Sequence, residues 1–235
     1  MKILDLNELL QAHPYPGRGI VLGRSADGQK AVIVYFIMGR SENSRNRIFE
    51  TTDDGIRTRA FDESKMVDPS LIIYHPVRRV GEVTVVTNGD QTDTIRDGLL
   101  ASKSYIDALR TRCYEPDGPN YTPRISGVVE KDGAFCLSIL KSADGDPACS
   151  HRYFYEYDAP LAGEGRFIHT YQENAEPLPS FEGEPRRVSV SAPDAETLAS
   201  QVWASLNEDN KVSLFVRTID LATGATDTRI VNKNQ

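Results

Sequence analysis

The stretch RISGVVEKDGAFCLSIL, residues 124–140, decides the fold. Two apolar runs, 124–130 and 134–140, flank the triplet Lys-Asp-Gly, and Asp-Gly is a strong turn signal between two strands. The stretch therefore predicts an antiparallel hairpin. The same pattern stands earlier in the chain, where GIVLGR (19–24), SADGQ and KAVIVYFIMG (30–39) predict another hairpin.

Short apolar runs typical of strands continue on both sides of these hairpins. We predict further strands at SLIIYHPV (70–77), EVTVVTN (82–88), HRYFYEY (151–157), GRFIHTY (165–171), RRVSVS (186–191), KVSLFVRTIDL (211–221) and TDTRIVN (226–232).

Helical spacing occurs in only a few places. Between 94 and 113 the apolar residues fall at steps of three, four and seven, which predicts a helix that Thr92 or Asp93 would cap. A second helix is expected at 193–206 and a short third one at 6–13. Many strands with helices in separated places favour an α+β fold over alternating βαβ units.

The chain is predicted to form one domain, residues 1–235. The stretch QENAEPLPSFEGEP (172–185) is rich in Pro, Glu and Gly and predicts a long exposed loop. We do not expect a domain boundary there, because the strand and helix that follow are too small to bury a core alone.

Composition excludes several classes of function. The formal net charge is −7, which argues against non-specific binding to nucleic acid or to an anionic membrane. The N-terminal residues do not read as a secretory signal, and no apolar run approaches the roughly 20 residues of a membrane span. Three scattered cysteines, one of them in CSH (149–151), give neither a disulfide framework nor zinc spacing, so we expect free thiols in a reducing cytoplasm and no metal site.

Three polar stretches follow predicted strands or helices, where binding sites are commonly built. GRSENSRNR (39–47) gathers arginines whose planar forks fit phosphate oxygens, although a solvated loop would have the same composition. TNGDQTDTI (87–95) enters a helix whose N-terminus would attract an anion, and the same residues are ordinary capping residues. YEPDGPNYTPRI (114–125) carries Glu115 and Arg124, or is only a rigid connection. Neither GxxxxGK[ST] nor GxGxxG is present, so no nucleoside triphosphate or dinucleotide fold is indicated.

Together these stretches resemble the monofunctional, archaeal-type IMP cyclohydrolase family. The matching pieces are VLGRSADG, GRSENSRNRIFE, IIYHPVRRVGEVTVVTNGDQTDTI and YEPDGPNYTPRI, in this order. The run from Arg78 to Ile95 is the most specific, and the resemblance is dense from about Gly19 to Arg124. Residues 1–16 are an N-terminal extension relative to the family's core.

The resemblance implies a four-layer αββα sandwich, two antiparallel sheets flanked by helices, similar to the N-terminal-nucleophile hydrolases. The chain begins Met-Lys-Ile with no evident autoprocessing site, so we expect the fold without that nucleophile. The implied reaction closes 5-formamidoimidazole-4-carboxamide ribonucleotide to IMP with loss of water, the last step of de novo purine synthesis. It implies a cytoplasmic homo-oligomer that binds a purine ribonucleotide and needs no cofactor.

The family's functional residues are carried over onto Arg47, Tyr74 and Glu115. Arg47 would stabilise the developing oxyanion or orient the formyl group. Tyr74 would donate or relay a proton to the formyl oxygen, and Glu115 would accept a proton from the attacking nitrogen or orient the carboxamide. The residues expected to bind substrate are Asn88, Thr92, Asp93, Thr94 and Arg124 around the nucleotide, with Arg24 and Arg45 on its phosphate.

Two other functions remain open from the sequence. A non-catalytic purine-nucleotide-binding or regulatory protein would keep the pocket, but Arg47, Tyr74 and Glu115 are all present, and a decayed binder would often lose one of them. An amidohydrolase acting on a related amide would need a nucleophile or an activated water, and no Ser/His/Asp or metal set stands out to supply it.

Overall fold

Two antiparallel sheets pack face to face in the computed structural model, which describes residues 2–66, 68–143 and 145–235. The first sheet has the strand order β11-β10-β1-β2-β12-β13. Its strands, in chain order, are β1 (Arg18–Arg24), β2 (Lys30–Met38), β10 (Glu164–His169), β11 (Arg186–Ser189), β12 (Lys211–Asp220) and β13 (Thr226–Asn232).

The second sheet has the order β3-β4-β5-β6-β7-β8-β9, so each strand pairs with its neighbour in the chain. Its strands are β3 (Arg47–Thr52), β4 (Gly55–Ala60), β5 (Val77–Val80), β6 (Val83–Thr87), β7 (Arg124–Val129), β8 (Phe135–Ala143) and β9 (Asp146–Tyr157).

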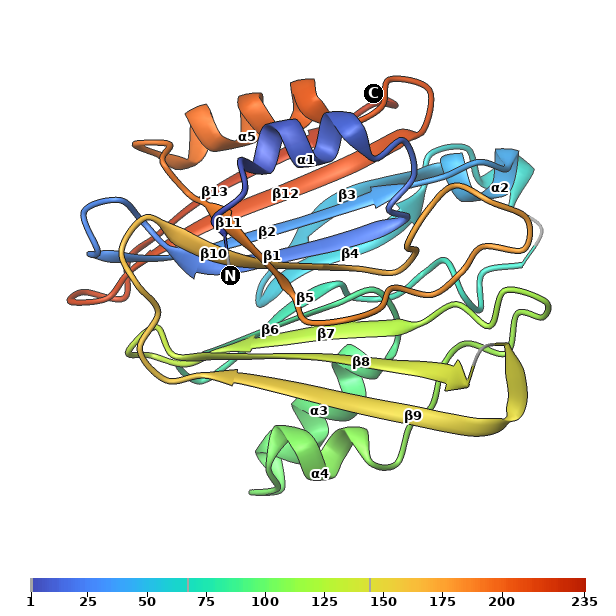
Figure 1. The fold of residues 1–235 in the computed structure, drawn as a ribbon, viewed down its shortest axis with the longest axis horizontal. Helices are drawn as coiled ribbons and strands as arrows, with labels where there is room; N and C mark the ends of the chain where they lie inside the picture. The colour runs from blue at the N-terminus through green and yellow to red at the C-terminus, as the bar shows by residue number, and fades with distance from the viewer. Residues whose placement is uncertain (1, 67, 144) are drawn as a thin grey trace.

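Helices cover the outer face of each sheet, which gives four layers (Figure 1). On the first sheet lie α1 (Leu6–Ala12) and α5 (Ala195–Ser205), and on the second lie α3 (Gln91–Leu100) and α4 (Tyr105–Leu109). A one-turn helix, α2 (Glu42–Arg45), and a 3₁₀ turn, Glu63–Lys65, lie in connections. The predicted αββα architecture is thus confirmed. No helix among the described residues is long and apolar enough to cross a membrane.

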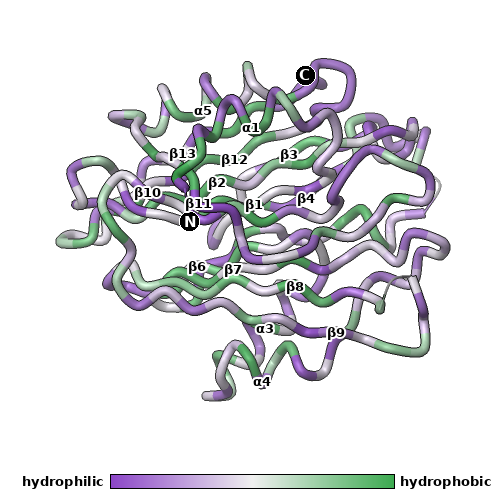
Figure 2. The backbone as a smooth tube through the Cα atoms, in the orientation of Figure 1, coloured by the Kyte–Doolittle hydropathy of each residue, from purple (hydrophilic) through white to green (hydrophobic). Residues whose placement is uncertain are grey.

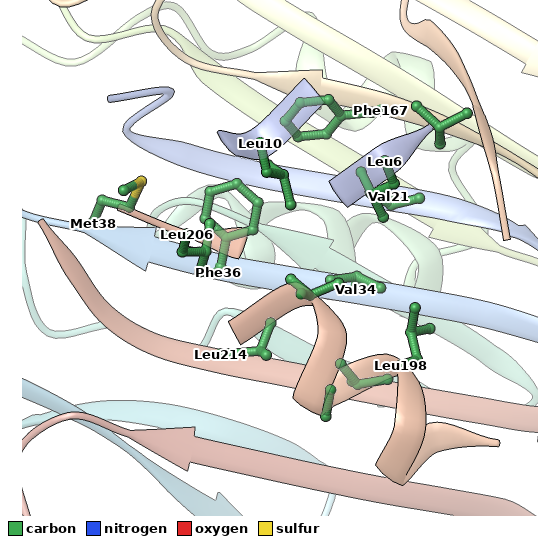
Figure 3. Packing of buried hydrophobic residues seen from close by; sticks show 14 of the residues in the cluster. Leu6, Leu10, Val21, Val34, Phe36, Met38, Phe167, Leu198, Leu206 and Leu214 are labelled. Atoms are coloured by element: carbon green, nitrogen blue, oxygen red, sulfur yellow. The ribbon is translucent and has the colours of Figure 1, made fainter. Parts of the chain in front are cut away.

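The continuous apolar runs arise because the central strands are buried on both faces. In β2, Ile33 and Tyr35 face the core between the sheets, whereas Val34 and Phe36 pack under α1 and α5 (Figure 3). Apolar residues accordingly follow the strands through the centre of the molecule, and polar ones gather in the connections (Figure 2). The hairpin at 124–140 is confirmed as β7 and β8.

The predicted helix at 94–113 is wrong, because the chain forms two helices, α3 and α4. Ser102 lies between them with a positive φ of 58°, and Ser104 caps α4 by accepting a hydrogen bond from the backbone N–H of Asp107. The N-cap of α3 is Asp90 and not Thr92 or Asp93, which lie inside the first turn. Apolar residues continue at helical spacing through this region, but the capping serine starts a separate helix.

The predicted strand at 70–77 is also wrong, since only Val77 is in a strand. The backbone N–H groups of Ile72 and Ile73 both donate to the carbonyl of Pro69, which folds the segment into a turn. The apolar pattern there reflects packing of turn residues. The sequence pattern did not predict strands β3 and β4 before this turn or β5 after it.

The N-terminal residues are part of the packing. Asp5 caps α1, and Leu6 and Leu10 are buried in the cluster beneath α5. Met1, the first residue of the expected extension, lies outside the described residues. The stretch expected as a loop, 172–185, connects β10 to β11, and two of its apolar side chains, Leu178 and Phe181, are buried.

Candidate active site

A cavity of about 290 Å³ opens at the end of the sandwich where β1 begins and β2 leads into α2. Segments far apart in sequence line it: the start of β1, the arginine stretch, the 114–125 connection and the β10–β11 connection. Three arginines face it, Arg18, Arg40 and Arg47, together with the carboxylates Glu115 and Asp117. This end of the molecule therefore gathers positive charge inside an acidic protein.

The arginine stretch places Arg47 through a compact turn. Ser41 and Ser44 form a capping box around α2, and a Cβ at Gly39 would lie 2.5 Å from the hydroxyl of Ser44, so only glycine fits there. Arg47 follows as the first residue of β3, and its Nε donates to the carbonyl of Ser44 at 2.9 Å.

Arg47 is fully buried, yet both of its terminal nitrogens lack a hydrogen-bond partner. Burial lowers the pKa of this guanidinium, and the charge of nearby Arg18 lowers it further. Buried donors without partners are costly. The two unpartnered nitrogens of this guanidinium can donate hydrogen bonds to an anionic oxygen.

Arg18 supplies the second guanidinium. Its backbone N–H donates to the hydroxyl of Thr170 at 3.1 Å, and Gly17 before it has a φ of 78° in the left-handed region, with Thr170 and Tyr171 too close for any Cβ. The Nε of Arg18 is buried without a partner. Burial acts to lower the pKa of Arg18, but the surrounding tyrosines and Glu115 outweigh it and raise the pKa, so the group stays charged.

Glu115 is the buried acid of the cavity. Its backbone N–H donates to the carbonyl of Thr122 at 2.9 Å, and the residue is only about 4% exposed. Burial raises the pKa of Glu115 to about 7, although Arg18 and Arg124 oppose the rise. A carboxyl group that titrates near neutral pH can both accept and return a proton.

Two tyrosine hydroxyls meet beside the arginines. The hydroxyl oxygens of Tyr35 on β2 and Tyr74 lie 2.8 Å apart, and the charges of Arg18 and Arg47 act on Tyr35. Burial raises the pKa of Tyr35 well above its usual value. The turn that carries Tyr74 is held by Thr58, whose hydroxyl accepts from the backbone N–H of Tyr74 at 2.9 Å.

A second polar group, at the start of α3, is saturated by internal hydrogen bonds. The Asn88 side chain accepts from the backbone N–H of Ile125 at 2.9 Å and from Gln91 at 3.0 Å, and it donates to the carbonyl of Pro123 at 2.8 Å. The hydroxyl of Thr92 donates to the carbonyl of Gly89 at 3.0 Å. These side chains are buried and do not line the cavity.

Arg124 connects this α3 network to the cavity. Its Nη1 donates to Asp90 and Gln91 at 2.7 and 2.8 Å, and it lies 3.9 Å from Glu115 Oε1. The absence of a side chain at Gly89 makes this approach possible, because a Cβ there would lie 2.7 Å from Arg124 Nη1 and 3.2 Å from Glu115 Oε1.

The structure does not bring the other expected binding residues to this cavity. Asp93 pairs with Arg78 at 2.7 Å, and Thr94 accepts from Arg112 at 3.1 Å. Arg45 is exposed and faces a different cavity, formed with Lys211 and Lys233. The remaining residue, Arg24, is the last residue of β1, and its Nε donates to the carbonyl of Gly28. Six residues of strand, roughly 20 Å, separate it from Arg18 at the cavity.

Sequence reasoning missed several residues that line or adjoin the cavity. Arg18 stands in YPGRG, between two glycines directly before a strand, and that context was a usable signal. Arg40 belongs to the predicted arginine stretch, but its contacts do not follow from local pattern. Its guanidinium lies 5.1 Å from the ring centre of Tyr15 and pairs at 3.1 Å with Glu176, more than 130 residues away in the chain. For Tyr35 the sequence pattern predicts only a place in a strand.

Metal-binding side chains do not gather here: over the part of the chain that the structure describes, no three His, Cys, Asp or Glu residues are grouped as a metal would require. Cys149 and His151 lie on β9, Cys149 exposed, and all three cysteines are free.

Comparison with known proteins gives a consistent result. The family model described as IMP cyclohydrolase-like protein matches residues 15–224. Two proteins of Methanococcus maripaludis named IMP cyclohydrolase are similar: that of strain C7 is 36% identical over 126 residues, 52% of this chain and 61% of the relative, and that of strain C5 is 32% identical over 180 residues, 71% and 86%. An IMP cyclohydrolase of Methanosphaera stadtmanae is 28% identical over 186 residues, 77% of this chain and 81% of the relative. The match to the first of these relatives thus spans about three fifths of that protein's length.

Proposed function

The chain belongs to the IMP cyclohydrolase-like family, and from that membership we propose that it closes 5-formamidoimidazole-4-carboxamide ribonucleotide to IMP with loss of water. The observation that carries the proposal is the convergence, at one cavity, of a buried arginine with free donors and a buried carboxyl group with a pKa near 7.

The reaction makes specific demands on the protein. The carboxamide nitrogen must attack the formyl carbon of the same molecule, so both groups must be held in a near-attack pose. A C–N bond forms, the nitrogen loses a proton, and negative charge develops on the formyl oxygen. That oxygen takes up two protons and leaves as water, while the former formamide nitrogen loses its proton, so that a C=N double bond forms in the new ring.

Arg47 meets the demand for a group that stabilises the developing charge. Its two unpartnered nitrogens are buried, where a charge-assisted hydrogen bond is stronger than in water. Because Nε is fixed by the carbonyl of Ser44, the fork is oriented before the substrate arrives. Arg18 adds a second positive charge beside it.

Glu115 meets the demand for a proton acceptor. With a pKa of about 7 it is partly ionised at neutral pH, which is the condition that favours general base catalysis. The same group, once protonated, can return the proton to the departing oxygen.

Tyr74 supplies a hydroxyl donor for the formyl oxygen. Its hydroxyl is paired with that of Tyr35, so either oxygen can pass a proton to the other. The two phenols lie close enough to Arg18 and Arg47 to interact with their charges.

The experiment that tests the function is direct. Purified protein is mixed with the formamido nucleotide in EDTA, and IMP is followed by absorbance and chromatography, with Glu115→Gln as the matched variant. We expect IMP to form without added metal or nucleotide, because the reaction is an intramolecular condensation, and to form far more slowly with the variant. Tight IMP binding without turnover would favour the non-catalytic nucleotide-binding protein instead.

We further propose that the protein is cytoplasmic and forms a homo-oligomer. The likeness of its fold to the N-terminal-nucleophile hydrolases stays a prediction from the resemblance. Three free cysteines support a reducing compartment. The long outer strand β9 exposes Tyr153 on an unpaired edge, which supports pairing with a second copy. Light scattering on the purified protein measures the oligomeric state.

A further inference from the structure

A second cavity, of about 480 Å³, adjoins the candidate active site. The two cavities share Asn120 and Leu178, so a ligand that fills the first reaches the second by passing these residues. The wall of the second cavity is formed by the end of β8 and by the β10–β11 connection.

Lys141 on β8 is the buried cation of this wall. Side chains two residues apart in a strand share a face, and Leu137 and Ile139 of β8 pack in the core between the sheets. Lys141 continues that inward face at the point where the cavity replaces the apolar core. It is about 8% exposed, an unusual environment for a lysine.

The charge of Lys141 is incompletely matched. Its Nζ donates to the backbone carbonyl of Phe181 at 3.2 Å, and the nearest carboxylate, Glu182, lies 3.7 Å away with a side chain that is 67% exposed. Solvent partly screens an exposed carboxylate, so Glu182 offsets the charge of Lys141 only in part. A buried ammonium group with one neutral partner retains capacity for an anion.

We propose that Lys141 binds the phosphate of the nucleotide, while the reacting groups lie against Arg47 and Glu115 in the first cavity. This rests on the proposed function for the identity of the ligand. A ribose separates the base from the phosphate in such a ligand, and the shared wall at Asn120 and Leu178 separates the two cavities in the same way. Glu182 also lines the second cavity and opposes an anion, so its removal tightens phosphate binding.

A structural role for Lys141 makes a different prediction. If its only task is to hold the β10–β11 connection through the carbonyl of Phe181, a glutamine would serve, because its amide also donates a hydrogen bond. Lys141→Gln therefore removes the charge and keeps the donor, whereas Lys141→Met removes both.

The experiment is titration calorimetry of IMP and of inosine, which lacks the phosphate, against the intact protein and its variants. We expect Lys141→Gln and Lys141→Met each to weaken IMP binding about 10- to 100-fold, as loss of a charge-assisted bond predicts, and to leave inosine binding unchanged. Lys131→Gln is the matched control, since Lys131 lies 69% exposed at the far turn of the same hairpin. Equal weakening of IMP and inosine, or normal IMP binding in Lys141→Gln, overturns the proposal.

Glu182→Gln changes an exposed side chain and keeps the test valid if the lysine variants do not fold. It should tighten IMP and not inosine; an unchanged IMP affinity counts against the subsite. The formation of IMP is measured separately. If the wild type makes IMP and the Lys141 variants still prefer IMP to inosine as it does, the subsite alone is rejected. If the wild type never makes IMP but the Lys141 variants lose that preference, the proposed reaction alone is rejected.

Discussion

Two polar regions lie side by side at this end of the sandwich, and they differ in how their hydrogen bonds are used. In the α3 network, the side chains of Asn88 and Gln91 are bonded to each other, and both Gln91 and Thr92 donate to nearby backbone carbonyls. In the cavity, the buried terminal nitrogens of Arg47 and the Nε of Arg18 have no partner.

The difference distinguishes a structural hydrogen-bond network from a candidate binding site. A saturated buried network stabilises one arrangement of the chain and leaves little capacity for a ligand. Unpartnered buried charges reduce stability and are kept where a ligand supplies the missing partner. Arg124 belongs to both regions, since one nitrogen binds Asp90 and lies near Glu115. Variants at the candidate catalytic residues should therefore change activity, whereas variants in the α3 network should change stability alone.

The largest effect is expected for Tyr74→Phe, which removes one hydroxyl and little volume. If that hydroxyl donates a proton in the transition state, kcat should fall on the order of 10²- to 10⁴-fold. The control is Tyr105→Phe, a buried tyrosine of the outer layer whose hydroxyl bonds to Ser126 and Ser138 at 3.1 and 2.6 Å. It should lose about 1 kcal/mol of unfolding free energy and keep its kcat. Similar kcat values in the two variants would reduce Tyr74 to a structural residue.

Arg47→Lys is expected to lower kcat on the order of 10²- to 10³-fold, because a lysine keeps the charge and loses the fork of donors. Arg45→Lys provides the comparison two residues away, on an exposed side chain that faces the other cavity. Steady-state kcat and KM are measured for both. A rise in KM alone for Arg47→Lys would instead indicate binding that is equal in the ground and transition states.

Glu115 should make the rate of the proposed reaction depend on pH. Since its carboxyl group has a pKa of about 7, kcat/KM should fall as the pH drops below that value, and Glu115→Gln should be slow at every pH. Glu130→Gln is the control, because burial also raises the pKa of Glu130 but this residue lies at the opposite end of β7. A wild-type profile that is flat from pH 5 to 8 would exclude Glu115 as the base.

The same group should make stability depend on pH. The folded carboxyl group holds its proton to about pH 7, whereas the unfolded one loses it near 4.5. The native state thus binds more protons between these values, and stability falls as the pH rises through that window, by up to about 3 kcal/mol. The difference between wild type and Glu115→Gln isolates this contribution. Other groups, such as His169, whose pKa burial lowers to about 3, titrate in both proteins.

Local pattern predicted the hairpins and an α+β fold, because strand period and Asp-Gly turns are properties of neighbouring residues. The arrangement of two packed sheets was predicted only from the family resemblance. It failed at Tyr74, where an apolar run after Pro69 folds as a turn. Arg18 and Lys141 escaped it for another reason. Their significance comes from partners on the β10–β11 connection, Thr170 and Phe181, and those contacts exist only after the sheets have assembled.

The smallest effect is expected in the α3 network, for Thr92→Val. The Thr92 hydroxyl bonds to Thr87 at 2.6 Å and to the carbonyl of Gly89 at 3.0 Å, and valine keeps its shape while removing those bonds. Unfolding free energy should fall on the order of 1 kcal/mol, measured by urea denaturation, with kcat and KM unchanged. Thr94→Val, on the outer part of the same helix, should change neither. Since Thr92 was a candidate substrate contact from the sequence, a raised KM at unchanged stability would return it to the site. It would also show that the α3 network and the cavity act as one region.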